Sequence, residues 1–214
     1  MKRQLLALAT VVLAWLASVN LAQAETYEFK ADVDYTVLKA PIKAPEAKGP
    51  FLMEYFWLGC PHCRAMNPMV QQFESAHPKV SVVRRPGLGN DRWVFDAHVY
   101  YALQAMGEGK LVYDLMEYYH QIASEERRLP DLTEIKAYVA KQGIDAKKFE
   151  QAMDDDATLN KLSVSYRDQQ ALGLKSVPVF IVNGKYQLRF DGFAGVTEPE
   201  ARFVALVDYL LKLK

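Results

Sequence analysis

The 214-residue chain is poor in soft metal ligands, with only two cysteines and four histidines. Cys60 and Cys63 lie three positions apart, whereas His77, His98 and His120 are isolated from one another along the chain. A structural zinc ion needs four Cys or His ligands, and a CxxC pair supplies only the first half of such a set. Because the sequence contains no second half, it argues against a zinc site.

The chain also lacks an excess of positive charge, since 26 Lys and Arg residues balance 26 Asp and Glu residues. Proteins that bind nucleic acid through its phosphates usually carry a basic surplus. We therefore expect no nucleic-acid partner. The sequence contains neither an internal repeat nor a low-complexity tract.

Long apolar runs are absent except at the N-terminus. Lys2 and Arg3 precede an apolar stretch over residues 5–19, and Ala22-Gln23-Ala24 has the small-x-small form of a signal-peptidase site. A membrane span needs about 20 consecutive apolar residues, so we predict a signal peptide over residues 1–24, cleaved after Ala24. An uncleaved anchor is the alternative.

Cleavage would leave 190 residues with 24 basic and 26 acidic side chains, a formal charge of −2. This length suits one domain, or one domain that carries an insertion. Export would take the protein to an oxidising compartment in which disulfide chemistry operates.

The motif Cys60-Pro61-His62-Cys63 stands between an apolar run over residues 51–57 and a helical pattern. Two thiols at this spacing can form an intrachain disulfide, and the helix N-terminus favours the thiolate of Cys60. A purely structural disulfide is the alternative, but closing so short a loop removes little entropy from the unfolded chain. His62, when protonated, would stabilise the thiolate; as an ordinary exposed loop histidine it would do nothing.

The first part of the pattern predicts strands over residues 35–38, 51–57 and 80–84, with a helix over residues 60–74 that kinks near Pro68. The run over residues 51–57 is apolar on both faces, which favours a central strand. The strand-helix-strand order favours a parallel pair with a right-handed crossover.

Residues 91–172 have apolar positions at helical spacing and predict an all-helical segment. Strands over residues 178–182 and 186–190 should flank a type I′ turn at Asn183-Gly184. A last helix should begin at Thr197, with Glu200 completing a capping box, and should end near residue 211.

Two stretches carry a family resemblance, Glu54-Tyr-Phe-Trp-Leu-Gly-Cys-Pro-His-Cys63 and Ser176-Val-Pro-Val-Phe-Ile-Val-Asn-Gly-Lys-Tyr186. Together with the helical segment, they make the chain resemble the thioredoxin superfamily, specifically the DsbA family of periplasmic thiol:disulfide oxidases. The resemblance covers nearly all of the chain after the signal peptide.

The resemblance implies an α/β, thioredoxin-like fold with a helical insertion domain. The thioredoxin-like domain would comprise residues 25–90 and 173–214, and the insertion residues 91–172. It also implies a cis peptide between Val177 and Pro178; an ordinary trans proline at the start of a strand is the alternative.

The resemblance further implies the chemistry. Cys60 would form a mixed disulfide with an exported client protein, and Cys63, shielded one turn into the helix, would be the leaving thiol. Pro61 and His62 would belong to the same catalytic motif. Val177 and Pro178 would form a ledge for an extended client segment.

Glu54 is the single charge within the apolar run, and a buried carboxylate is costly without a partner or a task. By resemblance it would move a proton to or from Cys63. An ion pair with Lys79 is the structural alternative. Trp57 and Leu58 would line a client groove, or else belong to the core.

We therefore predict a monomeric disulfide oxidase that needs neither a metal nor an external cofactor beyond the Cys60-Cys63 disulfide. Its partners would be unfolded or partly folded exported proteins with free cysteines, and a DsbB-like quinone-linked membrane oxidase would reoxidise it. A disulfide reductase or isomerase of the same superfamily and a peptide-binding chaperone are the alternatives.

The chain departs from the family pattern at three positions. Relatives often carry an acidic residue at the position of Asn67 and glycine at that of Ser176, and Arg64 adds a positive charge beside Cys63.

Overall fold

The computed structural model describes residues 27–193 and 195–213, so the predicted signal peptide over residues 1–24 lies outside the described residues. Strands and helices alternate at the start of the chain, and helices alone follow before strands return. The bounds of these elements are β1 Tyr35–Val37, β2 Phe51–Phe56, α2 Pro61–Ala76, β3 Ser81–Pro86, α3 Asp91–Ala105, η1 Gly109–Leu111, α4 Val112–Glu126, α5 Leu132–Lys141, α6 Ala146–Met153, α7 Asp156–Leu172, β4 Val179–Val182, β5 Tyr186–Leu188, η2 Asp191–Phe193 and α8 Pro199–Lys212.

The strands form one sheet in the order β1-β5-β4-β2-β3. β2 and β3 run parallel, as predicted, and the remaining neighbours are antiparallel. β2 therefore lies inside the sheet, and β1 and β3 are its edges. In the β4-β5 hairpin, Asn183 and Gly184 have φ values of 50° and 67°, the positive values that a type I′ turn requires.

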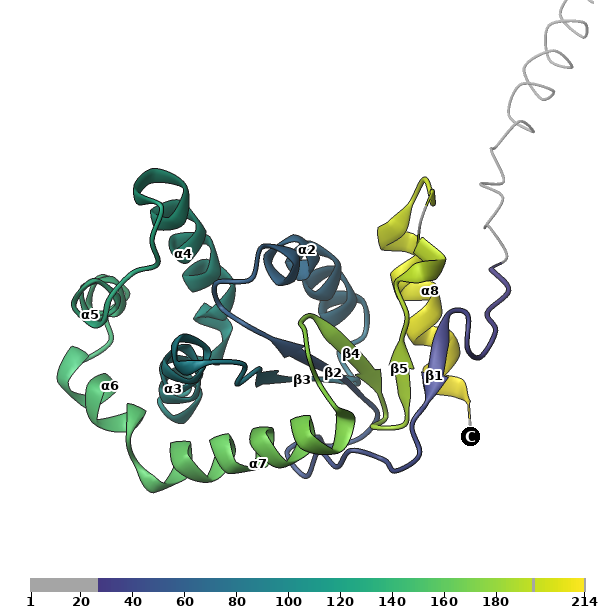
Figure 1. The fold of residues 1–214 in the computed structure, drawn as a ribbon, viewed down its shortest axis with the longest axis horizontal. Helices are drawn as coiled ribbons and strands as arrows, with labels where there is room; N and C mark the ends of the chain where they lie inside the picture. The colour runs from purple at the N-terminus through teal and green to yellow at the C-terminus, as the bar shows by residue number, and fades with distance from the viewer. Residues whose placement is uncertain (1–26, 194, 214) are drawn as a thin grey trace, which may run out of the picture.

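Helices cover both faces of the sheet. In Figure 1, α2 and α8 lie on one side and α7 on the other. Successive side chains of a strand point to opposite faces of the sheet. Leu52 of β2 accordingly belongs to the same core cluster as Phe73 and Phe203, whereas Met53 and Tyr55 belong to the core beneath the helical segment. This double coverage explains why the strand is apolar on both faces.

The helical segment from α3 to α7 lies between β3 and β4 in the chain, where residues 91–172 predict it. Asp131 and Glu134 form the predicted capping box of α5, and Asp145 caps α6. α7 ends at Gly173, whose φ is 60°, a left-handed conformation that glycine adopts without steric cost. The division into two domains stays a prediction.

The predicted start of the last helix was wrong. α8 begins at Pro199, and its cap residue Glu198 makes no side-chain capping bond, so Thr197 and Glu200 do not form the expected box. Proline suits the first helical position, because its φ is already helical and its missing N–H would have no acceptor there. α2 contains Pro68, as predicted, and ends at Ala76 rather than at residue 74.

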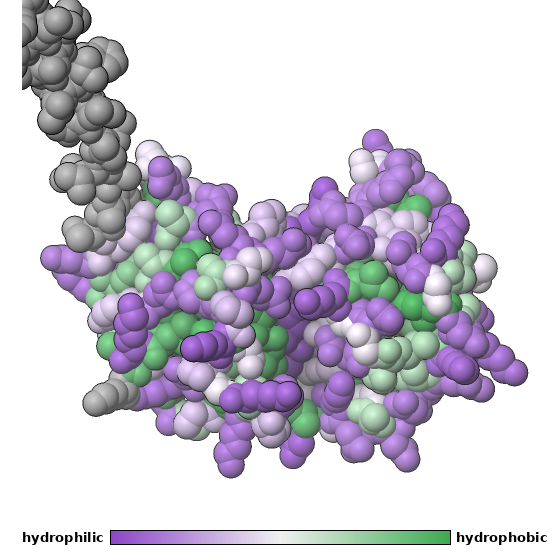
Figure 2. Space-filling view, turned by 180° about the vertical axis from the view of Figure 1, so that it is seen from behind, coloured by the Kyte–Doolittle hydropathy of each residue, from purple (hydrophilic) through white to green (hydrophobic). Residues whose placement is uncertain are grey.

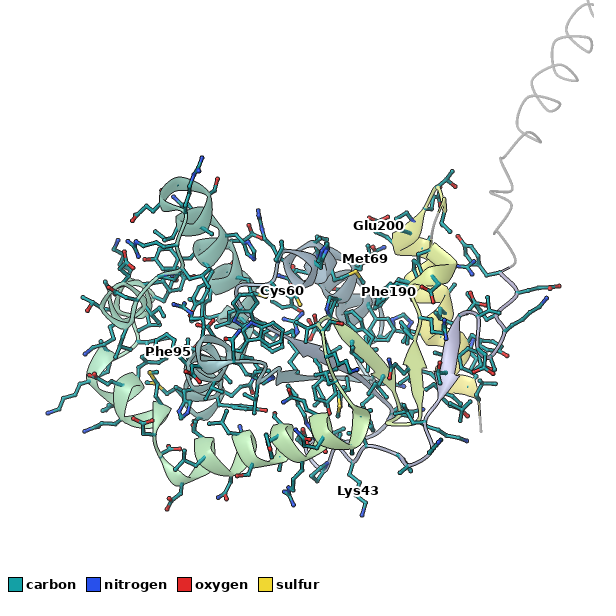
Figure 3. All side chains as sticks on the ribbon, viewed as in Figure 1. Lys43, Cys60, Met69, Phe95, Phe190 and Glu200 are labelled. Carbon is teal, nitrogen blue, oxygen red and sulfur yellow. The ribbon has the colours of Figure 1, made fainter. Side chains whose placement is uncertain are left out.

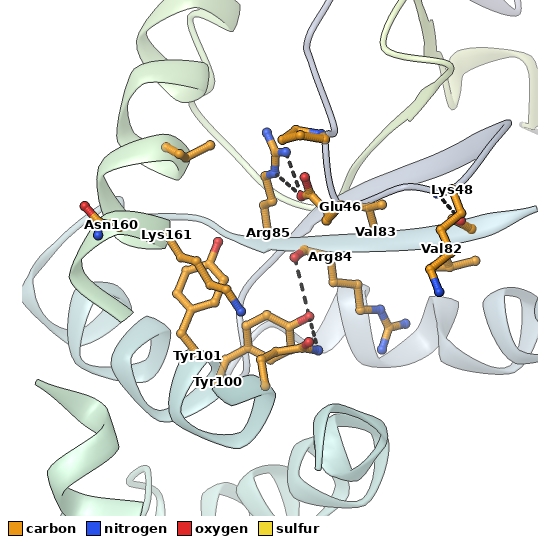
Figure 4. A pocket seen from close by; sticks show the side chains of 14 residues that line it. Glu46, Lys48, Val82, Val83, Arg84, Arg85, Tyr100, Tyr101, Asn160 and Lys161 are labelled. Carbon is orange, nitrogen blue, oxygen red and sulfur yellow. Dashed lines mark hydrogen bonds and ion pairs between the residues drawn. The ribbon is translucent and has the colours of Figure 1, made fainter. Parts of the chain in front are cut away.

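The face seen from behind is mostly hydrophilic, with smaller hydrophobic areas on both sides (Figure 2). Along β3 lies a pocket of about 570 Å³ whose walls come from α3, α7 and the loop before β2. Figure 4 shows Tyr100 reaching toward β3, and Arg85 bound to Glu46. Neither cysteine lines this pocket. Within the described residues, we find no helix with both the length and the apolarity needed to span a bilayer.

Candidate active site

Cys60 is the residue that caps the N-terminus of α2. Its backbone is extended, with φ −83° and ψ 115°, and its sulfur accepts a hydrogen bond from the backbone N–H of Cys63 at 3.3 Å. Pro61 fills the first helical position without the loss of a hydrogen bond. Figure 3 shows Cys60 near the middle of the molecule, where α2 begins.

Both cysteines are free thiols and both are buried, with 5% of Cys60 and 0% of Cys63 exposed. Cys60 is thus less exposed than the motif predicts for a thiol at a helix N-terminus. The reason is the loop before β4, because the Cys60 thiol donates a hydrogen bond to the carbonyl of Val177 at 3.6 Å.

The pKa values of the two thiols move in opposite directions. The hydrogen bond from the Cys63 thiol, together with backbone N–H groups of Cys63 and His62, lowers the pKa of Cys60 from 9.0 to about 6, although burial opposes this. Burial, followed by the hydrogen bond to Cys60 and the negative charges of Cys60 and Glu54, raises the pKa of Cys63 far above its usual value. Cys60 is therefore the thiol that ionises near neutral pH.

His62 is exposed and follows Pro61 in the first turn of α2. It acts on Cys60 in two ways, since both its backbone N–H and the charge of its ring lower the pKa of that thiol. The charge is the smaller of these contributions.

The peptide bond between Val177 and Pro178 is cis, as the resemblance implies. Val177 is buried, and its carbonyl, which is part of this peptide bond, faces the Cys60 sulfur, whereas Pro178 is partly exposed.

Glu54 lies beneath the dithiol and is 1% exposed. Its ion-pair partner is Arg84, whose Nε lies 2.7 Å from Glu54 Oε2. The structural alternative, an ion pair, is therefore present, but its expected partner Lys79 was wrong. The parallel register puts Arg84 directly opposite Glu54, whereas Lys79 precedes β3. Burial raises the pKa of Glu54, and Arg84 opposes that rise.

Two departures from the family pattern are tied to charges near the site. Asn67 is buried, and its Oδ1 accepts a hydrogen bond from Arg84 Nη2 at 3.3 Å. Arg64 pairs with Glu117 of α4 at 2.7 Å, so much of the positive charge that it adds beside Cys63 is compensated. Among the described residues, no three His, Cys, Asp or Glu side chains cluster so as to hold a metal ion.

Leu58 is 1% exposed and belongs to the core, so its assignment to a client groove was wrong. Trp57 is partly exposed, and its ring stacks on Trp93 with 5.0 Å between centroids. Sequence reasoning missed Trp93, Arg84 and a buried carboxylate, Asp96, that binds the Trp57 indole. Only Arg84 had a visible signal, as a charge at the end of an apolar strand.

Comparisons with known proteins agree with this geometry. The model of the family described as DSBA-like thioredoxin domain matches residues 95–201. A thiol:disulfide interchange protein DsbA of Pseudomonas aeruginosa is 30% identical over 205 residues, which cover 95% of this chain and 93% of the relative. The protein of the same name from Pseudomonas syringae is 29% identical and covers 92% and 90% of the two chains.

Solved structures give the same result. The crystal structure of Pseudomonas aeruginosa DsbA has a TM-score of 0.72 and 27% identity, and the match covers 86% of this chain and 93% of that one. DsbA from Xylella fastidiosa has a TM-score of 0.73 at 20% identity, which shows the likeness of the fold.

A dithiol at a helix N-terminus, beside a cis-proline on a thioredoxin-like sheet, defines the class of thiol:disulfide oxidoreductases. Within that class, the chain belongs to the DsbA family. The family's redox group is a disulfide, and Cys60 and Cys63 lie close enough to form one.

Proposed function

We propose that the protein donates a Cys60-Cys63 disulfide to exported client proteins in the periplasm. The observation that carries this proposal is the contrast between the two thiols. Cys60 caps a helix and its sulfur accepts a backbone N–H, whereas Cys63 is completely buried. A stabilised Cys60 thiolate favours the reduced enzyme, and a protein whose reduced form is stabilised is an oxidant.

In the first step, a client thiolate attacks the sulfur of Cys60. The enzyme's S–S bond breaks, a mixed disulfide forms at Cys60, and Cys63 leaves as a thiolate that takes up a proton. A second client thiolate then attacks the client sulfur and expels the Cys60 thiolate. The client loses two electrons and two protons in all, and the enzyme dithiol holds the electrons.

Cys60 is the attacked sulfur because Cys63 is completely buried, and it is also the better leaving group in the second step. The pKa of about 6 keeps it a thiolate at neutral pH, whereas the raised pKa of Cys63 returns that sulfur to the thiol. Pro61 and His62 belong to the first turn of α2, and His62 helps to lower the pKa of Cys60 relative to that of Cys63.

Glu54 would exchange a proton with Cys63. Its negative charge already raises the pKa of that thiol, and Arg84 restrains its carboxylate. Glu54→Gln should slow the first step, in which Cys63 leaves the enzyme disulfide as the mixed disulfide forms at Cys60. A variant that loses stability but exchanges at the wild-type rate would leave only a structural role.

The backbone beside Cys60 would bind the client. Val177 and Pro178 form a ledge against the sulfur, and an extended segment could pair with the Val177 backbone without recognition of its sequence. Unfolded or partly folded exported proteins with free cysteines fit such a ledge. A DsbB-like membrane oxidase would then reoxidise the monomeric enzyme, whose only redox group is its disulfide.

Equilibration of the purified protein with glutathione buffers tests the proposal. An oxidase should be mostly reduced even when most of the glutathione is oxidised, whereas a protein that stays oxidised there would be a reductase. Cys63→Ala should trap client proteins on Cys60 through mixed disulfides, and Cys60→Ala should trap none. A Cys60→Ala variant with full activity in cells would instead identify a peptide-binding chaperone.

A further inference from the structure

Trp57 contacts both cysteines through its backbone, although it lies three residues before the first of them. Its carbonyl accepts the backbone N–H of Cys60 at 3.0 Å. Its own backbone N–H faces the Cys63 sulfur, where it opposes the rise in the pKa of that thiol. The position of Trp57 therefore affects the position of both sulfur atoms.

The Trp57 indole is packed on several sides. One side stacks on Trp93, with 19° between the ring planes. The backbone of Gly59 lies against the same indole, because a Cβ added at Gly59 would come within 2.6 Å of ring atom Cζ2. The turn from Gly59 to Cys60 is thus shaped against this ring, and a displaced ring would displace the turn.

A buried carboxylate fixes the orientation of the indole. Trp57 Nε1 donates a hydrogen bond of 2.6 Å to Oδ2 of Asp96, a residue of α3 that is 1% exposed. Asp96 also accepts a hydrogen bond from the Tyr119 hydroxyl at 2.9 Å, and Arg92 lies 3.0 Å from its second oxygen. A buried carboxylate needs such partners, and the network holds it rigidly between α3, α4 and the end of β2.

No step of disulfide exchange consumes or releases a proton at Asp96, and the dithiol does not contact it directly. We trace its link to the site through the indole: Asp96 binds the Trp57 ring, the ring lies against Gly59, and Gly59 precedes Cys60. This chain of contacts connects the helical segment with the N-terminus of α2.

We propose that Asp96 is a positioning residue for disulfide exchange, which fixes the Trp57 indole and thereby holds Cys60 against the first turn of α2. This inference rests on the proposed role of Cys60 as the reacting thiolate. Loss of the Asp96 contact would let the turn relax, and the backbone N–H groups of α2 would then stabilise the thiolate less.

The decisive variants are Trp57→Phe, which keeps an aromatic ring but removes the N–H, and Asp96→Leu, which removes the acceptor. Each should shift the equilibrium with glutathione toward the oxidised enzyme by about tenfold, with a matching rise in the midpoint of Cys60 thiolate absorbance. The double variant should shift it no further than either single one, because both changes break the same bond. Asp96→Asn, whose amide oxygen can still accept the indole N–H, should retain most of the wild-type behaviour.

Ser165→Ala is the matched control for stability. It removes a buried 2.6 Å hydrogen bond to Tyr101 of α3 that shares no partner with Trp57. We expect it to unfold more easily but to titrate as the wild type does. Trp57→Phe also tests the inference if Asp96→Leu fails to fold, since it leaves the other partners of Asp96 in place.

Folded Trp57→Phe and Asp96→Leu proteins with wild-type Cys60 titrations would overturn the inference. So would additive shifts in the double variant, because Asp96 would then act through its charge rather than through the indole. If the wild-type Cys60 itself titrates like a free cysteine, the proposed oxidase function fails instead.

Discussion

Glu54 and Arg84 lie directly opposite each other on parallel strands and form an ion pair of 2.7 Å, with side chains that are 1% and 6% exposed. The Arg84 guanidinium also lies over the Tyr113 ring, 4.2 Å from its centroid, and binds Asn67. A buried carboxylate and a fixed positive charge thus both lie beneath the active site. Each charge is tolerated there because the other is present.

A double-mutant cycle tests this dependence. Glu54→Met and Arg84→Met should each lower the free energy of unfolding by about 3–5 kcal/mol, because each leaves a buried charge without its partner. The double variant contains no buried charge at this position and should be less destabilised than the sum by about 1–3 kcal/mol. Urea unfolding of the oxidised proteins measures all three values, and additivity within error would contradict the prediction.

His62→Ser should raise the pKa of Cys60 from about 6 toward 9.0, but by less than about one unit. The change is small because serine keeps the backbone N–H and removes only the ring charge, which is the weaker contribution. Thiolate absorbance against pH gives the midpoint. His77→Ser is the matched control, since His77 pairs with Asp208 at the other end of α2 and should leave the midpoint unchanged. Equal midpoints for the His62 variant and the wild type would show that this histidine does not act on Cys60.

The order of strands and helices could be predicted because it depends on local patterns. The apolar run over residues 51–57, the Asn183-Gly184 turn and the Asp131-Glu134 capping box each produced the expected element. The predicted start of α8 was wrong because two local signals competed there. The helix begins at Pro199 instead of using the expected capping box of Thr197 and Glu200.

The contacts around the site could be predicted only where the motif itself creates them. The sulfur of Cys60 accepts the N–H of Cys63 because helix geometry brings them together. The partner of Glu54 depends on the register of two strands, and Trp57 meets Asp96 across 39 positions of sequence. The first contact arises from strand register and the second from packing of α3 against the sheet, and neither leaves a periodic signal in the chain.

Arg85 should matter for stability without an effect on the dithiol. Its guanidinium binds Asp168 of α7, Glu46 at 2.7 Å and the carbonyl of Lys43 at 2.8 Å. These contacts join α7 and the loop before β2 to β3. Arg85→Met should lower the free energy of unfolding by about 3 kcal/mol, because it leaves the part-buried Asp168 without its cation. Arg128→Met removes an exposed arginine that also binds two carboxylates, and it should cost far less. A changed Cys60 titration in folded Arg85→Met would contradict the prediction that the Arg85 contacts do not affect the dithiol.

The stability of the reduced protein should depend on pH through Cys60. The folded pKa of about 6 lies below the ordinary 9.0, so the folded state loses the thiol proton at a lower pH than the unfolded state. The resulting stabilisation is complete above the unfolded value and is lost as the pH falls through about 6. Between these limits, the free energy of unfolding should rise by at most about 1.4 kcal/mol per pH unit relative to the oxidised protein, which has no thiol to titrate. Cys63 does not disturb the measurement below about pH 8, because its thiol stays protonated in the fold and largely so in the unfolded chain. Urea unfolding of both redox forms from about pH 5 to pH 8 gives the difference directly. Cys60→Ala cannot form the disulfide, and its free energy of unfolding, compared with that of the oxidised wild type, should lack this pH dependence. A constant difference across this range would show that the Cys60 thiolate is not stabilised in the fold.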